Sequence, residues 1–224
     1  EGLEPLCENT GGNVGKECDG GYAEFIKLPA QNFIKLPEAL DHRLKPAEIS
    51  VFCDAIATPY KVNRRTKTQA GEIVAIFGAG GGLGLHQVML SSWAGARVFA
   101  IETKPSKFAS CHAAGAEFVV DASSVSVNEA LIDLTKGRGV DVAIDYVSKR
   151  ETLEQATQAL GVRGRMVTLG GSAEVFRLNA RQLLLKEAEV LGSRYVSYNE
   201  ITESLDLVAK GVISPVVSVV RPLA

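Results

Sequence analysis

The stretch Ile73–Leu90, IVAIFGAGGGLGLHQVML, places an apolar run directly before a series of glycines. The run Ile73–Phe77 has the length of a strand and is typical of a strand buried on both faces of a parallel sheet. A helical pattern begins at about Leu83. This arrangement of strand, turn and helix is suited to binding a dinucleotide pyrophosphate. Small residues let the protein backbone come close to the pyrophosphate, and free N–H groups at the helix start face its negative charge.

The glycines do not follow a strict G-x-G-x-x-G pattern, because counting from Gly78 places Leu83 at the last position. Ala79, Gly81 and Gly84 instead fit A-x-G-x-x-G, which describes a turn one residue longer. A glycine-rich loop without a ligand is the alternative interpretation. The predicted cofactor contacts in this turn are Gly78, Gly81, Gly82, Leu83 and Gly84.

Apolar runs of strand length alternate with helical patterns along the rest of the chain. The runs after the first are Arg97–Ile101, Glu117–Val120, Val140–Val147 and Met166–Leu169. Ser126 and Glu129 predict a capping box at a helix start, and Gly95, Gly115 and Gly137 stand where helices should end. This repetition predicts an α/β fold with a right-handed, doubly wound parallel Rossmann sheet.

Glu102 is predicted to bind the adenosine ribose. It ends the second predicted strand, 18 residues after Gly84, where a carboxylate can accept hydrogen bonds from the ribose hydroxyls. A 2′-phosphate at about 4 Å from this carboxylate would cost roughly 1 kcal/mol in water and about 4 kcal/mol at an effective dielectric of 20. NAD is therefore favoured, and NADP stays possible because Lys104 and Lys107 could turn toward a phosphate.

Composition excludes several classes of partner. A chain with 46% hydrophobic and 22% charged residues and a net charge of −2 has no electrostatic footprint for nucleic acid or for an anionic membrane. None of its apolar runs approaches the roughly 18 residues that cross a bilayer. The four cysteines are scattered and do not suggest a disulfide framework, which favours a cytoplasmic protein.

The two ends of the chain differ from its middle. Residues 1–50 are rich in turn formers, and two short β-like runs at Ala23–Leu28 and Asn32–Leu36 predict small strands between loops. A helical stretch begins at about Lys45, and Tyr198–Gly211 has an amphipathic helical pattern. Because the chain starts at Glu1 without a methionine and ends on VISPVVSVVRPLA, we expect it to be a fragment.

Six segments carry a resemblance to a known family. They are EPLCENT, DGGYAEF, CDAIATPY, GAGGGLGLHQ, GVDVAIDYV and GRMVTLGG. In this order they resemble the medium-chain dehydrogenase/reductase superfamily, of the zinc alcohol dehydrogenase type. The resemblance implies the C-terminal part of a GroES-like, β-rich catalytic domain over 1–50, a dinucleotide-binding domain over 51–195, and the start of a return to the catalytic domain over 196–224.

The resemblance also implies an activity and site residues. The expected enzyme transfers a hydride between a nicotinamide cofactor and an alcohol or carbonyl substrate, with zinc polarising the oxygen in the full-length protein. In this view Thr58 and Asp145–Val147 approach the nicotinamide, and Lys107 reaches the adenosine ribose. Residues that would hold the carboxamide or lie near the cofactor's other face are Leu169, Gly170, Ser193 and Arg194. The apolar edge segment EVLGSRYV predicts a homodimer or homotetramer.

The segment VFCDAIATPY is expected from the resemblance to hold a catalytic-zinc ligand. Aligning Thr58 and Tyr60 with the family pattern places Asp54 at the ligand position, and a carboxylate is an acceptable zinc ligand. Cys53 is the softer donor, but neighbours on a helix point about 100° apart, so we expect Cys53 to pack on the apolar side. Cys7 matches the fourth cysteine of the family's structural-zinc lobe.

Two other functions fit the sequence. One is a zinc-free, NADPH-dependent reductase of quinones or enoyl thioesters, in which hydrogen bonds would meet the enolate charge. The other is a nucleotide-binding protein without catalysis. The three histidines, His42, His86 and His112, are expected to be packed or solvated and not catalytic.

Overall fold

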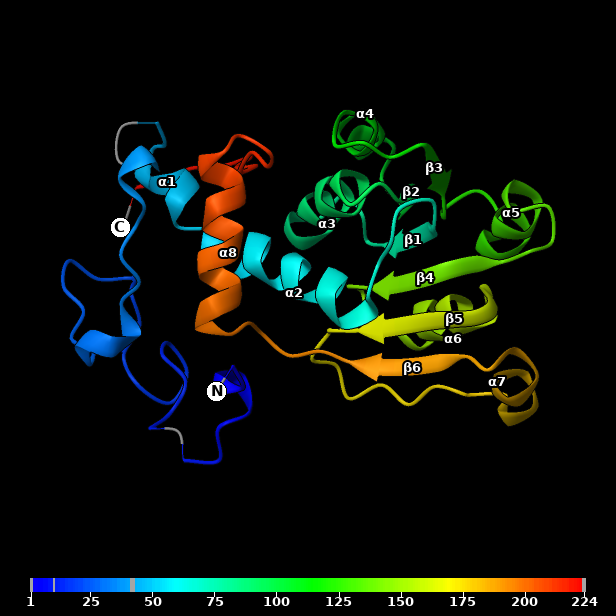
Figure 1. Cartoon of the computed structure of the whole chain (residues 1–224), viewed down its shortest axis with the longest axis horizontal. Helices are drawn as coiled ribbons and strands as arrows, with labels where there is room; N and C mark the ends of the chain where they lie inside the picture. Colours follow the sequence, from blue (N-terminus) through cyan, green and yellow to red (C-terminus); the bar gives the residue numbers. More distant parts are fainter. Residues whose placement is uncertain (1, 10, 41–42, 223–224) are drawn as a thin grey trace.

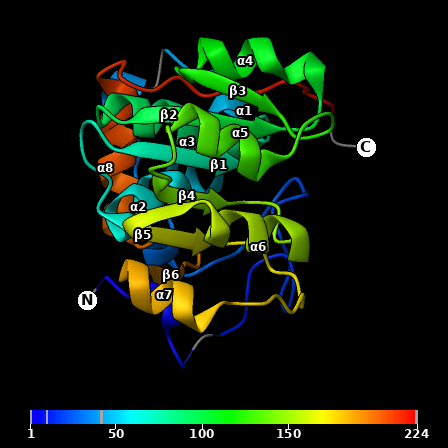
Figure 2. The ribbon, with the colours of Figure 1, turned by 90° about the vertical axis from the view of Figure 1, so that its right-hand side faces the viewer.

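The computed structural model describes residues 2–9, 11–40 and 43–222, and a parallel sheet forms the centre of this described part. The sheet has six strands in the order β3-β2-β1-β4-β5-β6, which Figure 2 shows from top to bottom. Their bounds are β1 Ile73–Phe77, β2 Arg97–Glu102, β3 Phe118–Asp121, β4 Val140–Asp145, β5 Leu160–Thr168 and β6 Glu189–Gly192. All neighbouring strands pair in parallel, so the predicted doubly wound sheet is confirmed.

Helices connect the strands on both faces. Their bounds are α1 Pro46–Ile49, α2 Ala57–Thr66, α3 Gly82–Trp93, α4 Phe108–Ala113, α5 Val127–Leu134, α6 Arg150–Gln158, α7 Ala180–Lys186 and α8 Tyr198–Ala209, with a π-helical turn at Phe52–Ile56. Within the described ranges, none of these helices combines the length and the apolar composition needed to cross a bilayer.

Helix boundaries follow the predicted capping chemistry. The Ser126 hydroxyl accepts a hydrogen bond from the Glu129 N–H, which is one of the two bonds of the predicted capping box, and α5 starts at the next residue. Gly95, Gly115 and Gly137 follow α3, α4 and α5 with φ values of +83°, +108° and +80°. Left-handed backbone of this kind costs glycine least, so these predicted helix ends are confirmed.

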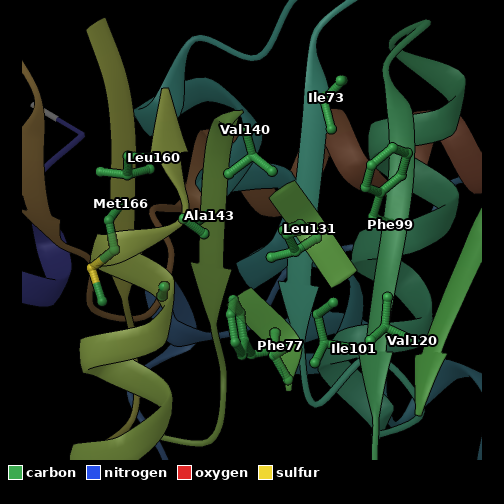
Figure 3. Close-up of a cluster of buried hydrophobic side chains, with 14 of the residues drawn as sticks. Ile73, Phe77, Phe99, Ile101, Val120, Leu131, Val140, Ala143, Leu160 and Met166 are labelled. Carbon is green, nitrogen blue, oxygen red and sulfur yellow. The ribbon is translucent and has the colours of Figure 1, made fainter. Parts of the chain in front are cut away.

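Alternate residues of the central strands pack into two separate apolar layers. Ile73 and Phe77 of β1 face a cluster that includes residues of α5 and α6 (Figure 3). Val74 and Ile76 face the opposite cluster, with residues of α2, α3 and α4. Because helices cover both faces, every residue of β1 is buried, which is why its sequence is continuously apolar.

A third apolar cluster joins the segment after β6 to the helices before β1. Leu205 of α8 and Ile213 pack with Phe52, Ile56 and Leu90. Figure 1 shows α8 in orange beside α2 in cyan. The chain thus returns to the neighbourhood of α2 after completing the sheet.

The strands predicted at Ala23–Leu28 and Asn32–Leu36 are wrong. The described residues between 2 and 40 contain 3₁₀ turns and an isolated bridge between Val14 and Cys18, and no strand. A strand needs a neighbour to pair its backbone N–H and C=O groups, and the described residues place none beside these runs. Phe25 is accordingly 88% exposed. The helix predicted from about Lys45 is divided into α1, the π-helical turn and α2.

Charged side chains tie the amino ends of the central strands together. Arg165 of β5 donates from Nη2 to both carboxylate oxygens of Glu72, at 2.7 and 2.8 Å, and these side chains are only 18% and 19% exposed. Asp141 of β4 accepts the Ile73 N–H at 2.8 Å and binds Arg138 through two hydrogen bonds.

Arg165→Leu is expected to lower the free energy of unfolding by about 1–3 kcal/mol, because it leaves the Glu72 carboxylate largely buried without its partner. Urea denaturation at pH 7 measures the change. Arg163→Leu is the matched control, because Arg163 Nε lies 3.8 Å from Glu187 Oε2 and these side chains are 80% and 77% exposed. This substitution should change the free energy of unfolding by less than about 0.5 kcal/mol. Equal effects of the two substitutions would contradict a stabilising role for the Arg165–Glu72 ion pair.

Candidate dinucleotide site at the carboxyl edge of the sheet

The carboxyl ends of the parallel strands meet along one edge of the sheet. The chain leaves β3 at one side and returns to the middle as β4, so the strand order reverses between β1 and β4. In sheets of this order a dinucleotide binds in the crevice outside that switch point. The loops after β1, β2, β4, β5 and β6 therefore form the candidate site.

The glycine turn is closed by backbone contacts. Gly78 has a φ of +74°, and the N–H groups of Gly78 and Ala79 both donate to the carbonyl of Ile101, at 3.0 and 3.2 Å. A Cβ on Gly84 would overlap the carbonyl oxygen of Gly78 and lie 2.6 Å from that of Ala79. Gly84 thus allows α3 to lie directly on the turn, which is the packing role of a final glycine.

The start of α3, unlike the glycine turn before it, is exposed to solvent. Gly82 begins the helix and is exposed, and a Cβ placed on it would meet no heavy atom within 4 Å. Leu83 follows, half-buried. The first N–H groups of a helix have no intrahelical partner, so this end of α3 can take an anion without losing other hydrogen bonds.

Glu102 lies against the glycine turn and is 7% exposed. Its Oε2 accepts the Gly80 N–H at 2.9 Å, and its Oε1 accepts those of Thr103 and Lys104 at 2.9 and 3.0 Å. A carboxylate has about four acceptor positions. Three backbone donors, together with the Thr103 hydroxyl at 3.4 Å from Oε1, therefore fix the orientation of the Glu102 carboxylate.

Gly80 is a site residue that the sequence analysis missed. A Cβ at this position would lie 2.5 Å from Glu102 Oε2 and 2.7 Å from Lys107 Cδ. Gly80, Glu102 and the half-buried Lys107 are therefore packed together. The run of three glycines contained the signal, but the A-x-G-x-x-G frame gave this position no role.

The segment Asp145–Ser148, the β4 tip, faces the glycine turn. The buried Asp145 carboxylate accepts the N–H groups of Val147 and Ser148 at 2.7 and 3.2 Å, and the Thr152 hydroxyl at 3.0 Å. Burial raises the pKa of Asp145, while these hydrogen bonds oppose the rise. Ser148 adopts a φ of +53°, and Val147 Cγ2 would lie 3.0 Å from a Cβ on Gly78. Gly78 and Val147 are thus neighbours across the switch point.

The tips of β5 and β6 adjoin the β4 tip. The Leu169 N–H donates to the Asp145 carbonyl at 3.4 Å, and a Cβ on Gly170 would overlap the Ser148 side chain. The Ser193 N–H donates to the Thr168 carbonyl at 3.1 Å. The residues predicted for the nicotinamide end therefore lie side by side along these strand ends. Arg194, by contrast, places its guanidinium 5.7 Å from the centre of the Tyr195 ring.

The π-helical turn holds Cys53 and Asp54, and α2 holds Thr58. The buried Thr58 hydroxyl donates to Asp54 Oδ1 at 2.9 Å. Cys53 and Asp54 are both exposed, so the prediction that Cys53 packs on the apolar side is wrong. The wider π turn makes adjacent residues diverge less than in an α-helix. Neighbouring protein nevertheless desolvates the Cys53 thiol and raises its pKa, and the Asp54 charge adds to the rise.

The described residues do not form a complete zinc site. Nowhere in the described ranges do three His, Cys, Asp or Glu side chains lie close enough to hold a metal ion. Asp54 could contribute one ligand, and Cys7 lies exposed in the amino-terminal segment. Since a tetrahedral site requires four ligands, these donors do not fit a zinc ion by themselves.

The two described histidines, His86 and His112, contact backbone groups. His86 is buried, with Nδ1 2.7 Å from the Gly82 carbonyl and Nε2 accepting the Val216 N–H at 3.0 Å. Burial lowers the pKa of His86, which keeps the ring neutral for this acceptor role. His112 is exposed, 3.2 Å from the Ala116 carbonyl. Both therefore match the prediction of packed or solvated histidines, and His42 lies outside the described residues.

Comparisons with known proteins match this chain to dehydrogenases. The family model for zinc-binding dehydrogenases matches residues 82–210. An alcohol dehydrogenase of Geobacillus stearothermophilus is 30% identical over 216 residues, which are 96% of this chain and 61% of that protein. An NAD-dependent alcohol dehydrogenase of Sulfurisphaera tokodaii is 26% identical over 97% of this chain and 61% of its own length. The chain therefore spans about three fifths of these relatives.

A solved structure shows the same architecture. It is a putative zinc-binding dehydrogenase of Sinorhizobium meliloti, bound to NADP, which superposes with a TM-score of 0.83 and 31% identity. The match covers 94% of this chain and 60% of that one.

Gly84→Ala and Gly82→Ala are expected to separate packing from binding. Gly84→Ala should lower the free energy of unfolding by at least about 1–3 kcal/mol, because the new methyl group meets backbone that cannot move aside. Gly82→Ala should change stability by less than about 0.5 kcal/mol, but should weaken binding of ADP-ribose by occupying the open space before α3. Urea denaturation and calorimetric titration measure the two effects. A destabilised Gly82→Ala protein would show that the open face is misassigned.

Proposed function

The chain belongs to the zinc-binding dehydrogenase family, and we propose that the protein transfers a hydride between NAD and an alcohol or carbonyl substrate. The observation that carries this proposal is the Glu102 carboxylate, held at the end of β2 against the glycine turn. Gly80 allows Glu102 and Lys107 to pack against the turn, and Gly84 allows α3 to do the same. The names of the relatives support the oxidoreductase assignment.

In this proposal, different residues at the carboxyl edge of the sheet bind different parts of the cofactor. The first N–H groups of α3 would bind the pyrophosphate, and Glu102 with Lys107 would bind the adenosine ribose. Val147, Leu169 and Gly170 would surround the nicotinamide, together with Thr58. NAD, when bound, supplies the hydride-accepting ring. The protein orients that ring and excludes water from it.

Glu102 is also the reason for preferring NAD over NADP. The carboxylate is buried beside the expected position of the 2′-hydroxyl, where a phosphate would meet a like charge. The Sulfurisphaera relative is named as NAD-dependent, whereas the related Sinorhizobium structure contains NADP. Lys107 packs beside Glu102 and would partly offset the repulsion of a 2′-phosphate.

A zinc requirement is proposed for the full-length protein only. Asp54, hydrogen-bonded to Thr58, is the proposed catalytic-zinc ligand of this chain, and Cys7 is the proposed structural-zinc ligand. Because the described residues do not complete either site, the chemistry assigned to this chain is cofactor binding and orientation.

Domain roles and assembly follow the same proposal. We assign residues 51–195 to cofactor binding, and 1–50 and 196–224 to a GroES-like catalytic domain. β6 is the edge strand of the sheet, and its free edge supports pairing with a second copy in a homodimer or homotetramer. A cytoplasmic location stays a prediction from the sequence.

The preference for NAD is tested by measuring Kd for NAD⁺ and NADP⁺ in the full-length protein. We expect NAD⁺ to bind at least about tenfold more tightly, as one like-charge contact implies. Glu102→Gln should bring the Kd values for NAD⁺ and NADP⁺ closer together, because it removes the negative charge and keeps an acceptor for the Gly80 N–H. Equal affinities in the unmodified protein would refute the preference.

The metal assignment is tested with Asp54→Ala and Cys53→Ala in the full-length protein, with zinc content measured by atomic spectroscopy. We expect Asp54→Ala to lower the zinc content by about one equivalent per chain, as loss of one of four ligands implies, while Cys53→Ala retains it. The opposite result would make Cys53 the ligand. A full-length protein without zinc would favour the quinone or enoyl-thioester reductase alternative.

A further inference from the structure

A buried polar network lies behind the candidate site and is not explained by cofactor contacts. Gln87 of α3 is fully buried, and its Nε2 donates to Asn63 Oδ1 at 2.7 Å and to Ser91 Oγ at 2.8 Å. Its Oε1 accepts the Tyr146 hydroxyl at 2.7 Å, and Ser91 Oγ donates to Asn63 Oδ1 at 3.1 Å. Both amide hydrogens of Gln87 are therefore used. These four residues are called the Gln87 network below.

The Gln87 network joins three elements that meet at the switch point. Asn63 belongs to α2, Gln87 and Ser91 to α3, and Tyr146 to the β4 tip; Figure 1 shows α2 running beside α3. The Tyr146 N–H also donates to the Phe77 carbonyl at 3.3 Å, at the end of β1. Tyr146 is thus held by its backbone to β1 and by its side chain to α3.

The position of Tyr146 connects this network to the cofactor crevice. The next residue, Val147, contacts the glycine turn at Gly78 and is 39% exposed. The glycine turn leads into α3, which carries Gln87. The Tyr146–Gln87 hydrogen bond therefore closes a loop of contacts that links the β1 turn, α3 and the β4 tip.

Burial keeps the network in one protonation state. Desolvation raises the pKa of Tyr146 well above its ordinary value, and the negative charge of Asp54 adds to the rise. Tyr146 therefore remains a neutral donor at physiological pH. Buried polar networks of this kind specify one arrangement when every member is paired, and an unpaired member destabilises them.

We propose that Tyr146 is a positioning residue for the nicotinamide half of the cofactor, and that its hydrogen bond to Gln87 fixes the β4 tip against the glycine turn. The inference rests on the proposed function. Glu102 lies on the β2 side of the switch point, so the adenosine half belongs there and the other mononucleotide lies over β4, β5 and β6. A displaced β4 tip would therefore disturb one half of the cofactor and spare the other.

Tyr146→Phe in the full-length protein tests this inference, with Kd measured by calorimetric titration for NAD⁺ and for ADP-ribose, which lacks the nicotinamide. The substitution removes one hydroxyl and leaves Gln87 Oε1 without its donor. We expect the Kd for NAD⁺ to rise about tenfold, as loss of one hydrogen bond implies, and the Kd for ADP-ribose to change by less than about twofold. A role in stability alone would lower Tm and leave the ratio of the two Kd values unchanged.

Tyr198→Phe is the matched control, because its hydroxyl bonds Asn32 at 3.3 Å at the start of α8, outside the loop of contacts. It should leave both Kd values unchanged. Should Tyr146→Phe fail to fold, Gln87→Met removes the same hydrogen bond, together with those to Asn63 and Ser91, with a side chain of similar length, and the ratio of the two Kd values should change in the same direction.

The outcomes separate this inference from the proposed function. An unmodified protein that binds neither NAD⁺ nor ADP-ribose overturns the proposed function and the inference with it. The inference alone is overturned if the unmodified protein binds both ligands and Tyr146→Phe weakens their binding equally or not at all.

Discussion

The direct contact between α3 and the turn after β1 is the constraint on which the candidate site depends. Gly84 lies so close to the carbonyl oxygens of Gly78 and Ala79 that no side chain fits between them. This approach aims the start of α3 at the crevice and sets the turn within reach of the β2 end. The Gly80 N–H then reaches Glu102, and Gly78 reaches Val147. One backbone contact thus fixes the relative positions of three loops that come from separate parts of the chain.

The sequence predicted the parts of this fold that local chemistry determines. β1 has the predicted bounds, Ser126 caps α5, and Gly95 ends α3, because burial on both faces, a capping hydroxyl and left-handed backbone each leave a short-range signal. The runs at Ala23–Leu28 and Asn32–Leu36 carry a strand-like composition, but composition does not supply a pairing partner. Pairing is a long-range property, and it decided against these two strands.

The candidate site was predictable to the same extent. The position of Glu102 at the end of β2 could be predicted because a strand end is local information. Gly80 was missed because its role depends on Glu102 and Lys107, both more than 20 residues away in the chain. Cys53 was misplaced because the sequence gives an α-helical pattern where the structure forms a π turn. The Gln87 network joins Asn63 to Tyr146 across 83 positions (146 − 63), and its members are ordinary polar residues in sequence, so only the fold brings them together.

The two sides of the switch point are stabilised by different chemistry. On the β2 side, charge and backbone act together, since the Glu102 carboxylate orients the turn through N–H donors and is also the group proposed to meet the ribose. On the β4 side, the tip is held by the buried Asp145 carboxylate and by the neutral Tyr146 hydroxyl. A substitution of Glu102 that also removes the acceptor for the Gly80 N–H would therefore alter the glycine turn as well as the proposed cofactor preference. A change on the β4 side alters a neutral hydrogen bond and leaves the Glu102 charge in place. In the proposed function, this separation allows the affinity for the nicotinamide and the choice between NAD and NADP to vary independently.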